Sequence, residues 1–145
     1  MKIVSIELTD DTLCESDRLW WKHLMSLFLK PGRQFEIRHW REESEIIEKA
    51  ERLGMISDRD STDFEVSVKG ILTSSVIDEI LNPDFCLQND QMTQFFSINI
   101  TDNLSCSHYG KELYVFDPSE EICRQLFLIL EPIKEYFTFE QYVAR

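Results

Sequence analysis

The sequence contains few of the residues that build flexible linkers or phosphate-binding turns. Glycine and proline occur only four times each in 145 residues. This scarcity excludes a collagen-like or linker-rich chain and argues against a glycine-rich phosphate cradle. Long hydrophobic runs are missing as well, because no apolar stretch approaches the roughly 20 residues that cross a bilayer. We therefore expect no contact with a membrane.

Cysteine and histidine are not grouped as metal or redox sites require. The four cysteines are far apart, and none forms a CxxC pair: Cys14, Cys86, Cys106 and Cys123. The three histidines have no partners at ligand spacing, so the sequence predicts no metal site and no cofactor. The chain opens with MKIVSIEL, which resembles a strand and not a basic, apolar leader. Reduced cysteines and a cytoplasmic location are the expectation.

Positively charged residues are also scarce. The chain has 15 Lys and Arg against 27 Asp and Glu, for a net charge of −12. The first 70 residues carry a net −4 and the remaining 75 a net −8. From Gly70 to Gly110 there is no Lys or Arg, and the carboxylates there are Asp78, Glu79, Asp84, Asp90 and Asp102.

Such a charge balance limits the possible partners. An acidic chain is repelled by phosphate backbones, so we expect no nucleic-acid binding, whereas a basic protein surface is attracted. A cluster of carboxylates over residues 78–102 would speed that encounter and orient it. The alternative is that the charge serves solubility alone and that these side chains point in different directions.

The residues that are present indicate an ordered α+β protein. Hydrophobic residues make up 43% of the chain, and its length is typical of one domain, which we assign to residues 1–145. Hydrophobic periodicity and helix-capping residues predict the order β-α-β-α-β-α-β-β-α. The expected strands are 2–8, 34–40, 64–69, 95–101 and 112–116. The expected helices are 12–30, 42–53, 73–81 and 119–132, followed by an aromatic tail packed as a last turn or two.

The polar and apolar alternation of these strands favours one solvated face per strand. We therefore predict a two-layer α+β fold, with a mostly antiparallel sheet of about five strands packed against helices. The strands 95–101 and 112–116 are expected to form a hairpin across a loop of about ten residues.

Two short motifs raise the possibility of an enzyme. Residues 58–62, DRDST, match the DxDxT spacing of aspartyl-phosphate phosphotransferases, whose first Asp is a nucleophile after a buried strand. Here only Met55 and Ile56 precede the motif, so a solvated loop is the simpler interpretation. Cys106 and His108 are close in sequence, but no cation lies nearby to activate the thiol. A small hydrolase-like enzyme with a Cys or paired-carboxylate site is kept as an alternative.

The aromatic residues separate into core and anchor candidates. Trp20 and Trp21 fall within an arc of about 120° on a helix, together with Leu24 and Phe28, so both are predicted to be buried. Trp40 instead shares a strand face with polar neighbours, among them Glu36 and Arg38. We expect Trp40, Phe85 and Tyr109 to be exposed aromatic anchors of an interface.

In composition and size the chain is similar to small inhibitor proteins, such as the immunity proteins that neutralise bacterial toxins. The likeness rests on no motif, so it assigns no role to any residue. We expect an acidic protein-binding or inhibitor protein, most concretely an immunity protein for a basic toxin such as a nuclease. Its expected binding residues are Asp78, Glu79, Asp84, Asp90, Asp102, Trp40, Phe85 and Tyr109. An adaptor or structural subunit, with the helix 42–53 or the aromatic tail at its interface, is a further alternative, and the oligomeric state is left open.

Overall fold

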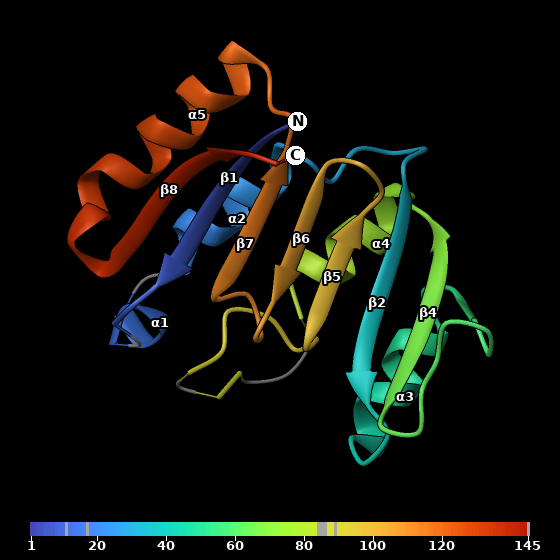
Figure 1. Cartoon of the computed structure of the whole chain (residues 1–145). Helices are drawn as coiled ribbons and strands as arrows, with labels where there is room; N and C mark the ends of the chain where they lie inside the picture. Colours follow the sequence, from blue (N-terminus) through green and yellow to red (C-terminus); the bar gives the residue numbers. More distant parts are fainter. Residues whose placement is uncertain (11, 17, 84–86, 89, 145) are drawn as a thin grey trace.

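Eight antiparallel strands form one continuous sheet in the computed structural model of the chain (Figure 1). The structure describes all residues except 11, 17, 84–86, 89 and 145. Across the sheet the strands follow the order β3-β4-β2-β5-β6-β7-β1-β8. Their bounds are β1 Lys2–Leu8, β2 Gln34–Trp40, β3 Met55–Ile56, β4 Glu65–Ile71, β5 Ser97–Ile100, β6 Leu104–Ser107, β7 Glu112–Phe116 and β8 Phe137–Val143.

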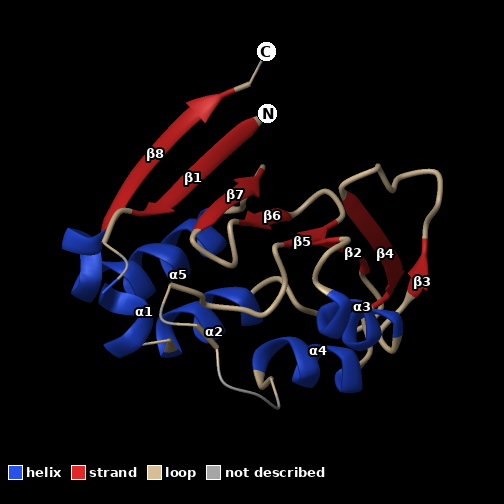
Figure 2. Ribbon diagram, turned by 90° about the horizontal axis from the view of Figure 1, so that it is seen from below, coloured by secondary structure: helices blue, strands red, loops and turns tan. Residues whose placement is uncertain are grey.

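The helices lie on one side of this sheet (Figure 2). They are α1 Thr12–Ser16, α2 Leu19–Ser26, α3 Ser44–Glu51, α4 Ser74–Leu81 and α5 Glu120–Leu130, and the 3-10 helix η1 Glu131–Tyr136 follows α5. Thr73 and Ser119 cap α4 and α5, because each hydroxyl accepts a bond from the backbone N–H three residues on. None of the helices that the structure describes is long and apolar enough to cross a membrane.

Strand alternation builds the core between the two layers. In β2, Phe35, Ile37 and His39 face the helices and are buried, and the neighbouring strands place Val68 and Ile98 opposite Ile37. The helix layer contributes both adjacent tryptophans, which are 4% and 1% exposed. The predicted burial of Trp20 and Trp21 is confirmed, and the α+β class with one antiparallel sheet agrees with the sequence pattern.

The number of strands and one pairing differ from the prediction. The sheet has eight strands where about five were expected, and β3, β6 and β8 are the additional ones. The predicted hairpin between β5 and β7 is wrong because β6 lies between them and pairs with both. β3 and β6 have only two and four residues, which is too short for an alternation pattern to stand out.

At both ends of the chain, the observed elements also differ from the predicted helices. The predicted helix over 12–30 is two helices, α1 and α2, and the second ends at Ser26. The aromatic tail was expected to be helical, but after η1 it extends as β8 and pairs with β1 along the whole of that strand. Pairing with a distant segment here outweighs the local pattern, as is common for strands.

Candidate functional site at the aromatic end of the sheet

Aromatic side chains from three separate segments meet at the end of the sheet where β2 stops. Trp40 is the last residue of β2, and its ring centroid lies 4.6 Å from that of Phe96, just before β5. The rings of His108 and Tyr109, in the turn between β6 and β7, each lie 5.5 Å from Phe96 and meet it edge-on. We call these four residues the aromatic cluster. Their packing gives this end of the sheet a preformed aromatic surface.

Glu43 ties two members of the aromatic cluster together. One carboxylate oxygen accepts the backbone N–H of Trp40 at 2.9 Å, and the other accepts the phenol of Tyr109 at 3.1 Å. Burial raises the pKa of Tyr109 to about 12, with further contributions from the charges of Glu43 and Asp90. The phenol therefore stays protonated at neutral pH, as a donor held in place by a carboxylate.

The turn that presents Tyr109 has an unusual backbone. His108, Tyr109 and Gly110 lie consecutively in the left-handed region, with φ of 53°, 57° and 93°. For the two non-glycine residues this costs roughly 1–2 kcal/mol each. A Cβ at position 110 would stand 2.8 Å from the buried indole nitrogen of Trp21, so only glycine fits. Such strain is concentrated at functional sites, where the surrounding structure holds a residue in a required position.

A hollow of about 500 Å³ opens beside Trp40. It is lined by Trp40, Arg41, Glu42, Asp63 and Phe64. Phe64 leaves 74% of its surface exposed, and Glu42 and Asp63 are exposed carboxylates. Arg41 donates from Nε to the backbone carbonyl of Thr62 at 2.8 Å, which holds the two walls of the hollow together. The hollow thus combines aromatic faces with two carboxylates and the guanidinium of Arg41, whose Nε is engaged by Thr62.

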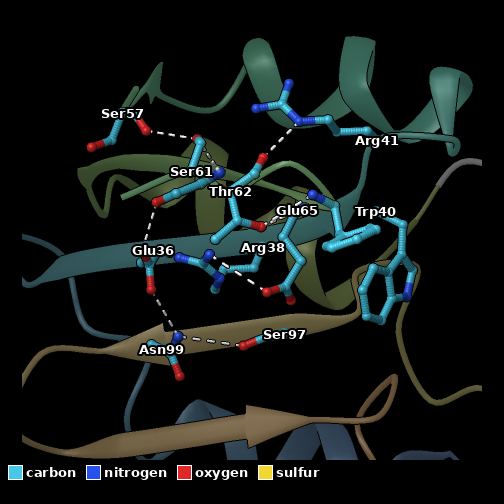
Figure 3. A network of polar contacts seen from close by, with 12 residues as sticks. Glu36, Arg38, Trp40, Arg41, Ser57, Ser61, Thr62, Glu65, Ser97 and Asn99 are labelled. Atoms are coloured by element: carbon cyan, nitrogen blue, oxygen red, sulfur yellow. Dashed lines mark hydrogen bonds and ion pairs between the residues drawn. The ribbon is translucent and has the colours of Figure 1, made fainter. Parts of the chain in front are cut away.

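The open face of the sheet behind Trp40 carries a polar network that is satisfied internally (Figure 3). Glu36 accepts from Arg38 at 3.1 Å, from Ser67 at 2.5 Å and from Asn99 at 3.1 Å. Arg38 also lies 3.6 Å from Glu65. Because these groups bond to one another across β2, β4 and β5, the network strengthens the sheet and fixes the strand that ends in Trp40.

Two of the residues predicted to bind a partner come together at the aromatic end, Trp40 and Tyr109. Asp90 contributes to the electrostatic environment of Tyr109, and the backbone N–H of Met92 donates to the carbonyl of Tyr109 at 2.9 Å. Glu43 and Phe96 were not predicted to belong to a site, and His108 was considered only as a neighbour of Cys106. Phe96 lies within the predicted strand 95–101, but in the structure it precedes β5 and is partly buried against Trp40.

The other predicted binding residues lie elsewhere. Asp78 and Glu79 belong to α4 in the helix layer, where Asp78 accepts from Asn82 and Glu79 is 3.8 Å from Arg52. Asp102 sits in the turn between β5 and β6, at the end of these strands opposite to Tyr109. Asp84 and Phe85 are outside the described residues. The carboxylates over 78–102 that are described therefore do not form one patch.

The two motifs that suggested an enzyme do not form a catalytic arrangement. Cys106 is 1% exposed in the core, and burial raises the pKa of its thiol to about 12. The side chain of His108 is instead exposed at the sheet end, with Nε2 3.2 Å from Glu112. Asp60 pairs with Lys69 at 2.6 Å, and hydrogen bonds from Lys69 and then Ser57 lower its pKa.

No three potential metal-ligating side chains meet within the described part of the chain. Comparison of the chain with known proteins found no matching family model, no matching curated protein and no matching solved structure.

Proposed function

We propose that this protein binds a basic protein partner through the aromatic end of its sheet and thereby inhibits or regulates that partner. The observation that carries the proposal is the convergence of Trp40 and Tyr109, from two segments far apart in the chain, on the carboxylate of Glu43. Rigid aromatic anchors surrounded by charged groups are the usual composition of a strong protein interface.

The hollow beside Trp40 suits one Lys or Arg side chain of the partner. Its carboxylates, Glu42 and Asp63, supply opposite charge, and the rings of Trp40 and Phe64 supply faces for a cation–π contact. Such a contact contributes about 0.5–2 kcal/mol, depending on how much water it excludes. The net charge of −12 would add long-range attraction and a faster encounter.

The most concrete form of this proposal is an immunity protein for a basic toxin, such as a nuclease. Occluding the surface with which the toxin approaches nucleic acid would explain an acidic chain that presents carboxylates and aromatic rings together. The alternative of a small enzyme has less support, because Cys106 is directed into the core and Asp60 is engaged with Lys69.

The proposal predicts salt-sensitive binding that depends on Trp40. The probes are purified basic nuclease domains of bacterial toxins, titrated calorimetrically with this protein at low and high salt. For a domain that binds, Trp40→Ala should weaken the affinity about 30-fold or more, as for a central anchor. The matched control is Met55→Ala, which shortens a side chain that is 80% exposed at β3 and should leave the affinity unchanged.

A charge reversal gives the same test without disturbing aromatic packing. Asp63→Lys changes the hollow, whereas Asp78→Lys makes the same change of charge on α4. We expect the first to reduce affinity and association rate strongly and the second only slightly. If the two charge reversals reduced the affinity equally, the proposed site would be wrong. Absence of salt-sensitive binding to any of the domains would count against the proposed function itself.

A further inference from the structure

The outermost strand of the sheet, β8, has an open side. Figure 2 shows it as the last strand next to β1, above the helix layer. All six residues from Thr138 to Val143 are exposed. Two of them are large apolar or aromatic side chains with 44% exposure, Phe139 and Tyr142, and Val143 is 73% exposed. A strand of this length and composition at a sheet edge is a template for another strand.

The hydrogen-bond pattern shows which backbone groups of β8 are available. Tyr136 and Ala144 bond to residues 9 and 1 on either side of the β1–β8 pairing, at 2.8 Å each. Antiparallel pairs alternate between bonded and non-bonded positions, so the even-numbered residues of β8 direct their N–H and C=O groups to β1. The odd-numbered residues direct theirs outward: Phe137, Phe139, Gln141 and Val143. The N–H of Phe137 is already taken, because it donates to the carbonyl of Lys134. For Phe139, Gln141 and Val143, no bond from another described residue to the outward backbone groups is present.

β8 lacks most of the features that commonly protect a sheet edge. Its sequence, FTFEQYV, contains no proline and no lysine, and its register with β1 is continuous, without a bulge. Glu140 is its one charged residue. Buried or paired edges satisfy their backbone groups, so the open edge over residues 138–143 is suited to strand addition.

An apolar groove of about 240 Å³ runs beside β8, between that strand and α5. Its lining includes Phe127 from α5 and Phe137 and Phe139 from β8. Phe127 is 58% exposed. The exposed parts of Phe127, Phe139 and Tyr142 amount to roughly 200–350 Å², since an aromatic side chain offers about 150–250 Å². A standard interface takes about 800 Å² from each partner, so these side chains supply roughly a quarter to two fifths of it and the strand backbone adds to that share.

We propose that β8 pairs antiparallel with β8 of a second copy of this chain, about a two-fold axis at Gln141. An antiparallel edge is self-complementary, because the same groups of both copies meet across the axis. Only registers that pair odd-numbered residues with odd-numbered residues use the outward groups. Centring the axis at Glu140 would set two carboxylates opposite each other.

Centring the axis at Gln141 avoids that repulsion. Phe139 of each copy then lies opposite Val143 of the other, on the helix side of the sheet and next to the groove. Glu140 lies opposite Tyr142 on the open side. The two sheets become one continuous sheet through both copies, and the most exposed apolar side chain of the strand is covered.

The charge of the chain distinguishes this interface from the proposed partner-binding site. Two copies of net charge −12 repel each other, so screening by salt should strengthen the dimer. Binding of a basic partner should weaken with salt. The dimer uses β8 and α5, which are separate from Trp40 and Tyr109, so this inference does not depend on the proposed function.

The test is sedimentation equilibrium of the full chain across a range of concentrations and salt. We expect a reversible dimer whose dissociation constant falls as salt is raised. Gln141→Pro removes an outward N–H without touching the bonds to β1, and it should weaken the dimer at least about tenfold while the melting temperature of the monomer stays unchanged. Gln141→Thr keeps the N–H and is the matched control, which should still form dimers.

Val143→Lys provides a second variant in case proline disturbs the strand. The variant replaces the apolar contact with Phe139 of the other copy by a lysine, a residue with which natural edge strands prevent pairing with further strands. It should therefore also yield monomers. A wild-type chain that stays monomeric at every concentration and salt overturns the proposal. Dimers that survive both Gln141→Pro and Val143→Lys overturn it equally, because they must use another surface.

Discussion

The two edges of the sheet satisfy their backbone groups in different ways. At the β4 edge, Thr62 Oγ1 accepts the N–H of Glu65 at 3.0 Å, and Ser61 Oγ accepts the N–H of Ser67 at 2.9 Å. The N–H of Ser57 donates to the carbonyl of Ser67 at 2.8 Å, and β3 pairs with β4 at Lys69. At the β8 edge, Lys134 accepts the N–H of Phe137, but no described residue bonds to the outward backbone groups of Phe139, Gln141 and Val143.

This difference gives the DxDxT motif of the sequence a structural explanation. Ser61 and Thr62, its last two residues, cap the edge of β4, and Asp60 pairs with Lys69 of the same strand. The polar segment that resembled a phosphotransferase motif therefore closes one side of the sheet. The aromatic tail, in contrast, adds a strand and leaves the other side open. Within one sheet, the polar edge is covered and the apolar edge is available for association.

The strongest test of this comparison places proline in β4, the strand whose outer side is covered, at a residue whose N–H points to that outer side. Ser67→Pro removes an N–H that is bonded to Ser61, in a fully buried residue. We expect a loss of about 3 kcal/mol or more in the free energy of unfolding, measured by urea denaturation. Ser67→Ala, which loses only the hydroxyl bond to Glu36, should cost about 1 kcal/mol. If Ser67→Pro proved as harmless as Gln141→Pro, the two edges would not differ as described.

A smaller effect is expected from a methyl group at Gly54, just before β3. A Cβ there would stand 2.5 Å from the carbonyl oxygen of Lys69, which is backbone and cannot move aside. Gly54→Ala should therefore push β3 away from β4 and lower the free energy of unfolding by about 1–3 kcal/mol. The measurement is the urea midpoint, with amide exchange at Lys69 as a local readout. Met55→Ala alters the same strand without this close approach and should change neither.

The smallest expected effect concerns the ion pair at the covered edge. The pKa of Asp60 is lowered in the folded protein, so its stabilisation is present above its unfolded pKa of about 3.9 and is lost as pH falls through the folded value. Asp60→Asn should melt slightly below the wild type at neutral pH, and the two should converge in acid. Melting temperatures across this pH range provide the check, with Asp58→Asn as a control for loss of one carboxylate. A difference independent of pH would contradict this role of Asp60.

The parts of the fold that follow from local pattern were predictable from the sequence. β1 and β2 were predicted with their observed bounds because polar and apolar residues alternate along them. Residue type and position indicated the cap of α5, Ser119, and left Thr73 and Ser74 as alternatives for α4, of which the structure has Thr73. Trp40 was singled out because its strand face is otherwise polar, and it lies in the candidate site.

The remaining features depend on contacts between segments far apart in the chain. β8 exists because it pairs with β1 across almost the whole length of the sequence, and no local pattern identifies a distant strand partner. The bond between Glu43 and Tyr109 spans 66 positions, and the left-handed backbone of the turn is maintained by packing of Gly110 against Trp21. Thus sequence periodicity determined which faces are buried, because burial follows from side-chain alternation along each strand. Tertiary structure alone decided which rings and carboxylates meet and which edge stays open, because those outcomes depend on the pairing of distant strands.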